Sequence, residues 1–161
     1  MKIAIIVYSY TGNTLSVCQQ LKNHLEQSEN DCIINKIEVN SEYDPNKGFN
    51  RFSITSVPDP TGYDALVFAA PVNAFTLSPV MKSYLRDIKP IKNIRTAFIV
   101  TQHLPYPFFG GNRALRRMKK FCRMSGADVT GGVVINWSRK DRQQQIDKAL
   151  EFLTDILKAE N

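Results

Sequence analysis

The chain has 161 residues, of which 43% are hydrophobic and 22% charged, and its formal net charge is +6. This length favours a single domain over residues 1–161, and this balance excludes a disordered or fibrous chain. No apolar run approaches the roughly 18 residues of a membrane span, and the first run ends in a polar turn, unlike a signal peptide. The three cysteines form no C-x-x-C pair, which disfavours disulfides and a zinc site and favours a reducing, cytoplasmic setting.

Apolar runs alternate along the chain with segments of helical periodicity. The predicted strands are Ile3–Val7, Cys32–Val39, Ala65–Ala70, Thr96–Val100 and Asp128–Ile135. The predicted helices carry apolar stripes at Leu15, Cys18, Leu21 and Leu25; at Met81, Tyr84, Leu85 and Ile88; within Asn112–Ser125; and at Ile146, Leu150, Leu153 and Leu157. We expect Ser78 to cap the second helix, and Ser138 with Asp141 to open the last. This alternation predicts an α/β fold with a doubly wound, five-stranded parallel sheet.

The connection between the second and third strands, residues 40–63, is unusually long for a compact domain. One interpretation is a short irregular helix near Asn46–Ile54 that covers the sheet with Phe49 and Phe52. The other is a mobile flap beside a ligand site. The first is slightly favoured.

The loop after the first strand has the composition of an anion-binding turn. Ser9, Thr11 and Thr14 supply hydroxyls, Asn13 supplies an amide, and Gly12 lets the backbone approach a ligand closely. Because the loop lies between a strand and a helix N-terminus, unpaired N–H groups and the helix dipole also converge on it. It contains no lysine and matches neither a Walker A loop nor a G-x-G-x-x-G turn, which disfavours a nucleoside triphosphatase or a dinucleotide dehydrogenase.

The stretch Ser9-Tyr10-Thr11-Gly12-Asn13-Thr14 resembles the phosphate loop S/T-x-T-G-N-T of the flavodoxin-like FMN proteins. The resemblance extends over almost the whole chain in segment order and length, and it implies strand order 2-1-3-4-5 with FMN at the switch between strands one and three. It also implies that the loops after strands three and four contact the flavin. Those candidate residues are Pro71, Val72, Asn73, Ala74, Phe75, Thr76, Thr101, Gln102, His103, Gly110 and Gly111.

Aromatic residues in these loops are candidates for stacking on the flavin ring. Phe75 follows the third strand, and Tyr106, Phe108 and Phe109 follow the fourth, where a hydrophobic cluster under the loop is an equal alternative. Trp137 follows the fifth strand at the far edge, and we expect it to serve packing.

The resemblance favours an FMN-dependent electron-transfer protein. An NAD(P)H-dependent reductase of quinones or similar acceptors, and a flavin-free binding or regulatory domain, remain open alternatives. The chain departs from the acidic flavodoxins in its positive charge, and no residue is identified as catalytic.

A helix expected from Asn112 holds Arg113, Arg116, Arg117, Lys119, Lys120 and Arg123 and no acidic residue. The other 15 of the 21 basic residues equal the 15 acidic ones, so the net charge can be assigned to this helix. A solvated face and a dock are equally weighted interpretations. As a dock near Arg113, Arg116, Arg117 and Lys120, it would take an acidic redox protein or the phosphates of NAD(P)H, whereas nucleic acid lacks a supporting motif and no membrane partner is expected.

Overall fold

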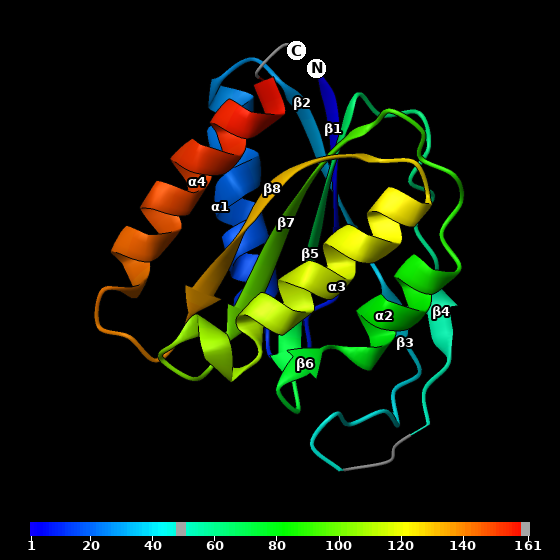
Figure 1. Cartoon of the computed structure of the whole chain (residues 1–161), viewed down its shortest axis with the longest axis vertical. Helices are drawn as coiled ribbons and strands as arrows, with labels where there is room; N and C mark the ends of the chain where they lie inside the picture. Colours follow the sequence, from blue (N-terminus) through cyan, green and yellow to red (C-terminus); the bar gives the residue numbers. More distant parts are fainter. Residues whose placement is uncertain (48–50, 159–161) are drawn as a thin grey trace.

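The computed structural model describes residues 1–47 and 51–158 (Figure 1). Its main sheet is parallel along the order β2-β1-β5-β7-β8, and the short β6 pairs antiparallel with the end of β5. The strands are β1 (Lys2–Val7), β2 (Asp31–Lys36), β5 (Ala65–Asn73), β6 (Thr76–Leu77), β7 (Arg95–Gln102) and β8 (Asp128–Asn136). Counted along this path alone, the order is 2-1-3-4-5, which confirms the predicted doubly wound sheet.

Helices cover both faces of the sheet (Figure 1). They are α1 (Asn13–Gln27), α2 (Pro79–Arg86), α3 (Gly111–Met124) and α4 (Arg142–Lys158), with a short 3-10 turn, η1, at Pro107–Phe109. Helices α1 and α4 bury one apolar layer, and α2 and α3 bury the other. No helix in the described part of the chain is both long enough and apolar enough to cross a membrane.

The apolar residues of the strands point alternately into these two layers. Ile3, Ile5 and Val7 of β1 face the α1 and α4 layer, whereas Ala4 and Ile6 face the other. Strands β1, β5 and β7 are buried on both faces, which explains their unbroken apolar runs. Their carboxyl ends therefore meet at one edge of the sheet, on either side of the switch between β1 and β5.

The prediction of one strand over Cys32–Val39 is wrong in its second half. The pairing of β2 with β1 ends at Lys36, opposite the last residue of β1, so the sheet offers no further partner there. The chain then leaves the sheet, and β3 (Glu38–Val39) pairs antiparallel with β4 (Ile54–Ser56). The run Cys32–Val39 thus belongs to two sheets.

The prediction of a helix near Asn46–Ile54 is also wrong for the described residues, since neither 46–47 nor 51–54 is helical. Phe52 does cover the α2 and α3 layer, where its ring lies 5.2 Å from that of the buried Tyr43. Phe49 falls outside the described residues. Strand pairing between β3 and β4 takes the place of the expected helix.

Two predicted helix starts need correction. Ser78 does occupy the N-cap position of α2, but its side chain makes no capping hydrogen bond. Helix α4 begins at Arg142, so Ser138 lies in the preceding turn and forms no capping box. The Asp141 carboxylate instead accepts hydrogen bonds from Arg139 and Gln145, which competes with the expected arrangement.

Candidate functional site

A cavity of about 320 Å³ lies at the carboxyl ends of β1, β5 and β7. Its lining is Tyr8, Tyr10, Thr11, Asn13, Thr14, Pro45, Asn46, Pro71, Val72, Asn73, Ala74, Ser78, Thr101, Gln102, His103 and Trp137. The structure thus brings together residues from all three loops that the sequence singled out. Six predicted residues lie outside this lining, namely Ser9, Gly12, Phe75, Thr76, Gly110 and Gly111.

The loop between β1 and α1 is arranged to leave donors free. Gly12 adopts a φ of 91°, which favours glycine, and it sits at the N-cap position of α1. The hydroxyl of Ser9 accepts a hydrogen bond from the Leu15 amide at 3.3 Å, so its own proton remains available. Within the described residues, the backbone amides of 10–14 donate to no protein oxygen. Free amides and hydroxyls at a helix N-terminus form an anion-binding site.

A buried hydroxyl pair ties this loop to β7. The Oγ1 atoms of Thr14 and Thr101 lie 2.7 Å apart, and both residues are buried. One hydroxyl donates to the other, and therefore one proton of the pair stays free to reach a ligand. The pair also fixes the loop against the strand two places away in the sheet.

Two further hydroxyls in the cavity were not predicted as site residues. Tyr8 is 4% exposed and Ser78 is 1% exposed, and neither hydroxyl has a hydrogen-bond partner among the described residues. Burial, with smaller contributions from Tyr43 and Tyr10, raises the pKa of Tyr8 to about 12, so its phenol stays protonated near neutral pH. Buried polar atoms without partners are rare in native proteins, so these two hydroxyls are candidate donors to a bound group or an ordered water. The position of Tyr8 directly before the loop was the available sequence signal.

The turn after β5 forms one wall of the cavity. Strands β5 and β6 make a tight hairpin in which Asn73 pairs with Thr76, and the two residues of its tip, Ala74 and Phe75, have φ values of 46° and 61°. This turn leaves Ala74 in the lining of the cavity. The ring of Phe75 is 60% exposed and lines a separate hollow beside α3. Its stacking on a flavin stays a prediction.

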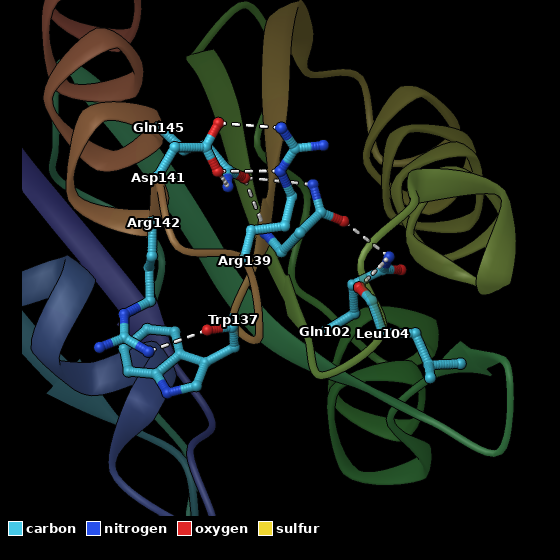
Figure 2. Close-up of polar contacts among 8 residues, drawn as sticks. Gln102, Leu104, Trp137, Arg139, Asp141, Arg142 and Gln145 are labelled. Atoms are coloured by element: carbon cyan, nitrogen blue, oxygen red, sulfur yellow. Dashed lines mark hydrogen bonds and ion pairs between the residues drawn. The ribbon is translucent and has the colours of Figure 1, made fainter.

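Gln102 holds the loop after β7 rather than offering a free side chain (Figure 2). Its Nε2 donates to the carbonyls of Leu104 (3.0 Å) and Tyr106 and to Oδ1 of Asn136 (2.8 Å). Its Oε1 accepts the amide of Gly111 at 2.8 Å. Gly111 was predicted to contact the flavin, but its backbone amide is not a free donor because it is already bonded within the protein.

Gly110 packs closely against the hairpin tip, while its contact with a flavin stays a prediction. Its φ is 120°, and a Cβ at this position would lie 2.6 Å from the backbone carbon of Phe75. Only a glycine lets the loop after β7 pack against the tip of the β5–β6 hairpin at this distance. The two walls of the cavity are thus in backbone contact.

The network continues from Asn136 to Gln145 and the turn before α4, where Figure 2 shows Arg139 and Asp141. Oε1 of Gln145 accepts from the Asn136 amide and side chain at 3.0 and 3.1 Å, while Nε2 of Gln145 donates to Asp141. Hydrogen bonds from Arg139 and then Gln145 lower the pKa of Asp141 to about 2. An unbroken chain of side-chain bonds therefore connects the loop after β7 to the start of α4.

Trp137 was expected to serve packing, and the structure shows a second position for it. It packs against the α1 and α4 layer, but it also lines the cavity. The guanidinium of Arg142 lies 4.5 Å from its ring centroid and donates to its carbonyl at 2.8 Å (Figure 2). These contacts fix the indole at the cavity wall.

The other aromatic candidates stack on one another. The rings of Tyr106 and Phe108 are 5.4 Å apart and nearly parallel, and Phe109 lies 4.5 Å from Phe108. None of the three lines the cavity in the described structure. The alternative of a hydrophobic cluster in this loop is the arrangement found, although Tyr106 and Phe108 are exposed.

These observations define an α/β protein with a polar-lined cavity at its topological switch point. No protein-family profile and no curated protein matches the sequence. Solved structures match it in fold, among them flavodoxin 1 from Bacillus cereus, with 16% identity, 100% of each chain covered and a TM-score of 0.70. A flavoprotein from Lactobacillus acidophilus NCFM in complex with FMN matches at 16% identity, with 92% of this chain and 97% of that chain covered and a TM-score of 0.64.

The azoreductase AzrA has the same fold at 12% identity, with 98% of this chain and 99% of that chain covered and a TM-score of 0.66. The chain therefore has the flavodoxin-like fold, in agreement with its strand order.

Proposed function

We propose that this protein binds FMN noncovalently in the cavity and carries electrons between redox partners. The observation that supports this most strongly is the cavity itself: free amides and hydroxyls lie at one end, and two of its lining residues, Tyr8 and Ser78, carry buried hydroxyls without a partner among the described residues. The fold, shared with flavodoxins and with a flavoprotein in complex with FMN, adds independent support. The three buried, free thiols suit the reducing cytoplasm in which we place the protein.

The donor set fits the two chemically different ends of FMN. The phosphate would be held by the amides of residues 10–14 and by the hydroxyls of Ser9 and Thr11, without a lysine or arginine. The ring would lie among Val72, Ala74 and Trp137, with the hydroxyls of Tyr8 and Ser78 as donors to its polar edge. When bound, FMN supplies the uptake and release of electrons, while the chain binds it, orients it and shields it from water.

Titration of the apoprotein with FMN tests this proposal. We expect Thr11→Ala to weaken binding by about 1–3 kcal/mol, which is roughly a 5- to 150-fold rise in Kd, because a hydrogen bond to a charged group is lost. Gly12→Val should weaken it further, since the side chain would occupy the space of the phosphate and strain the positive φ. The exposed Thr55→Ala in β4 is the matched control and should leave Kd unchanged. Equal dissociation constants for all four proteins would refute the loop assignment.

An NAD(P)H-dependent reductase is the second candidate, favoured by the shared fold of AzrA. The two functions differ in how the bound flavin is reduced. Rapid bleaching of its absorbance by NADH or NADPH alone would indicate the reductase, whereas a flavin that bleaches only with a protein or chemical reductant would indicate the carrier. A purified protein that stays colourless with added FMN would show that the fold has lost its flavin.

A further inference from the structure

Helix α3 presents an unpaired positive surface, which we call the basic face. It consists of Arg113, Arg116, Arg117, Lys119, Lys120 and Arg123. All are exposed except Lys119, which is half-buried, and none forms an ion pair with another described residue. Six cations along one helix repel one another, so this arrangement weakens the helix by itself. A bound counter-charge would relieve that repulsion.

The basic face covers the whole solvent side of the helix. At about 100° per residue the six cations fall within an arc of about 160°, while Ala114, Met118 and Cys122 point into the core. Met124 lies within the same arc and is 73% exposed. With 14 residues the helix is about 21 Å long. This length exceeds what the phosphates of one nicotinamide nucleotide need, and it suits a macromolecular partner with several carboxylates.

The basic face begins at a hollow of about 250 Å³ with a mixed polar and aromatic lining. Phe75, Phe108, Arg113 and Arg116 line it, together with Gly110 and Asn112. Phe108 is 71% exposed and Phe75 is 60% exposed, so both rings offer apolar surface beside two guanidinium groups. Aromatic and arginine side chains around a small pocket are the usual anchors of protein interfaces.

The hollow adjoins the cavity through a single turn of backbone. Ala74 lines the cavity and the next residue, Phe75, lines the hollow, and Figure 1 shows the β5–β6 hairpin beside the start of α3. A partner seated on the hollow would therefore lie against the wall of the proposed flavin site. Electron exchange requires a short distance between the two redox centres.

We propose that the basic face and the hollow dock an acidic redox protein. The inference rests on the proposed FMN-dependent function. In each encounter one electron leaves the partner's reduced metal centre and enters the flavin, and two encounters, with protons from solvent, reduce the flavin fully. Complementary charge would accelerate the encounter, and the two rings would fix its orientation.

The test uses the FMN-loaded protein and a reduced, acidic plant-type [2Fe–2S] ferredoxin as the probe. The double variant Arg116→Glu/Arg117→Glu reverses two charges on the basic face. The control Lys148→Glu/Lys158→Glu makes the same change of net charge on α4, across the sheet, where both lysines are exposed and unpaired in the described structure. Stopped-flow absorbance gives the second-order rate of flavin reduction, and calorimetry gives the affinity for ferredoxin with and without FMN.

We expect the α3 variant to lose at least about tenfold in rate at low salt, whereas the control loses at most about threefold. The difference should disappear at about 0.5 M salt, because exposed charges are then screened. Equal rates for the two variants would overturn the dock, and so would basic-face-dependent binding to phosphatidylserine vesicles or duplex DNA without any response to ferredoxin. FMN affinity should equal that of the wild type in both variants. Failure to bind FMN in all proteins would refute the proposed function, while the calorimetric comparison on the apoproteins would still decide the dock.

Discussion

Replacing Gln102 by leucine removes the side chain that holds the loop after β7. The change removes Oε1, which accepts the hydrogen bond of the Gly111 amide. It also removes Nε2, which donates to the carbonyls of Leu104 and Tyr106 and to Oδ1 of Asn136. The carbonyls of Leu104 and Tyr106 belong to exposed residues, so water can replace their lost bonds. Gly111 and Asn136 are buried, so the Gly111 amide and Oδ1 of Asn136 would be left without partners.

The expected cost follows from the two buried groups. An unsatisfied buried donor or acceptor costs about 1–3 kcal/mol, so Gln102→Leu should lower the free energy of unfolding by about 2–6 kcal/mol. This is a large share of the roughly 5–15 kcal/mol typical of a domain. In urea denaturation the midpoint should fall with little change in the slope m.

The matched control is Gln143→Leu. This side chain is exposed, its hydrogen bonds lie at the surface, and its loss should change stability by no more than about 0.5 kcal/mol. If Gln102→Leu lay within about 1 kcal/mol of the wild type, the loop would not depend on this network and the reasoning would be refuted.

Three further changes probe the packing, the charge and the acid stability. Gly132→Ala would place a Cβ 2.9 Å from the Cβ and carbonyl of Phe98, and thermal unfolding should show a loss of about 1–3 kcal/mol; an unchanged Tm would contradict this packing. No described cavity-lining residue is acidic, so the new carboxylate in Asn73→Asp should repel the extra negative charge of fully reduced FMN. We expect the reduction potential for the second electron of bound FMN to fall by roughly 40–90 mV, which corresponds to about 1–2 kcal/mol. Potentiometry that shows no shift would count against a flavin at this wall. Asp141 has a pKa lowered from 3.8 to about 2, first by Arg139, so its contribution to stability is complete above pH 4 and lost as the pH falls to 2. Between these pH values the free energy of unfolding of Asp141→Asn should fall less steeply than that of the wild type. Parallel curves of unfolding free energy against pH for the two proteins would show that Asp141 does not contribute to acid stability.

The sheet and the donor-rich loop after β1 could be predicted because their signals are local. Buried parallel strands have continuous apolar runs, and the donors of Ser9 to Thr14 lie within six residues of one another. The division of Cys32–Val39 between two sheets could not be predicted. It depends on where β1 ends, and thus on a partner strand about 30 residues away.

The polar network around Gln102 shows the same limit. Its members come from the ends of β7 and β8, the start of α3 and the first turn of α4, and no spacing in the sequence reveals their contact. The sequence therefore suggested that Gly111 is a ligand donor, whereas the fold satisfies its amide internally. The packing role predicted for Trp137 is confirmed, but its place in the cavity lining could not be predicted, because it depends on how the turn after the edge strand β8 is directed.

The tip of the β5–β6 hairpin has a consequence for the heat resistance of this protein. Ala74 and Phe75 both have positive φ, where Asn-Gly is the common pair and other residues cost about 1–2 kcal/mol each. Selection for survival at higher temperature should therefore readily replace this dipeptide with Asn-Gly. Such a variant would melt later, but it would lose the ring that lines the hollow beside α3. At this turn, thermal robustness and the proposed partner recognition make opposite demands on the same two residues.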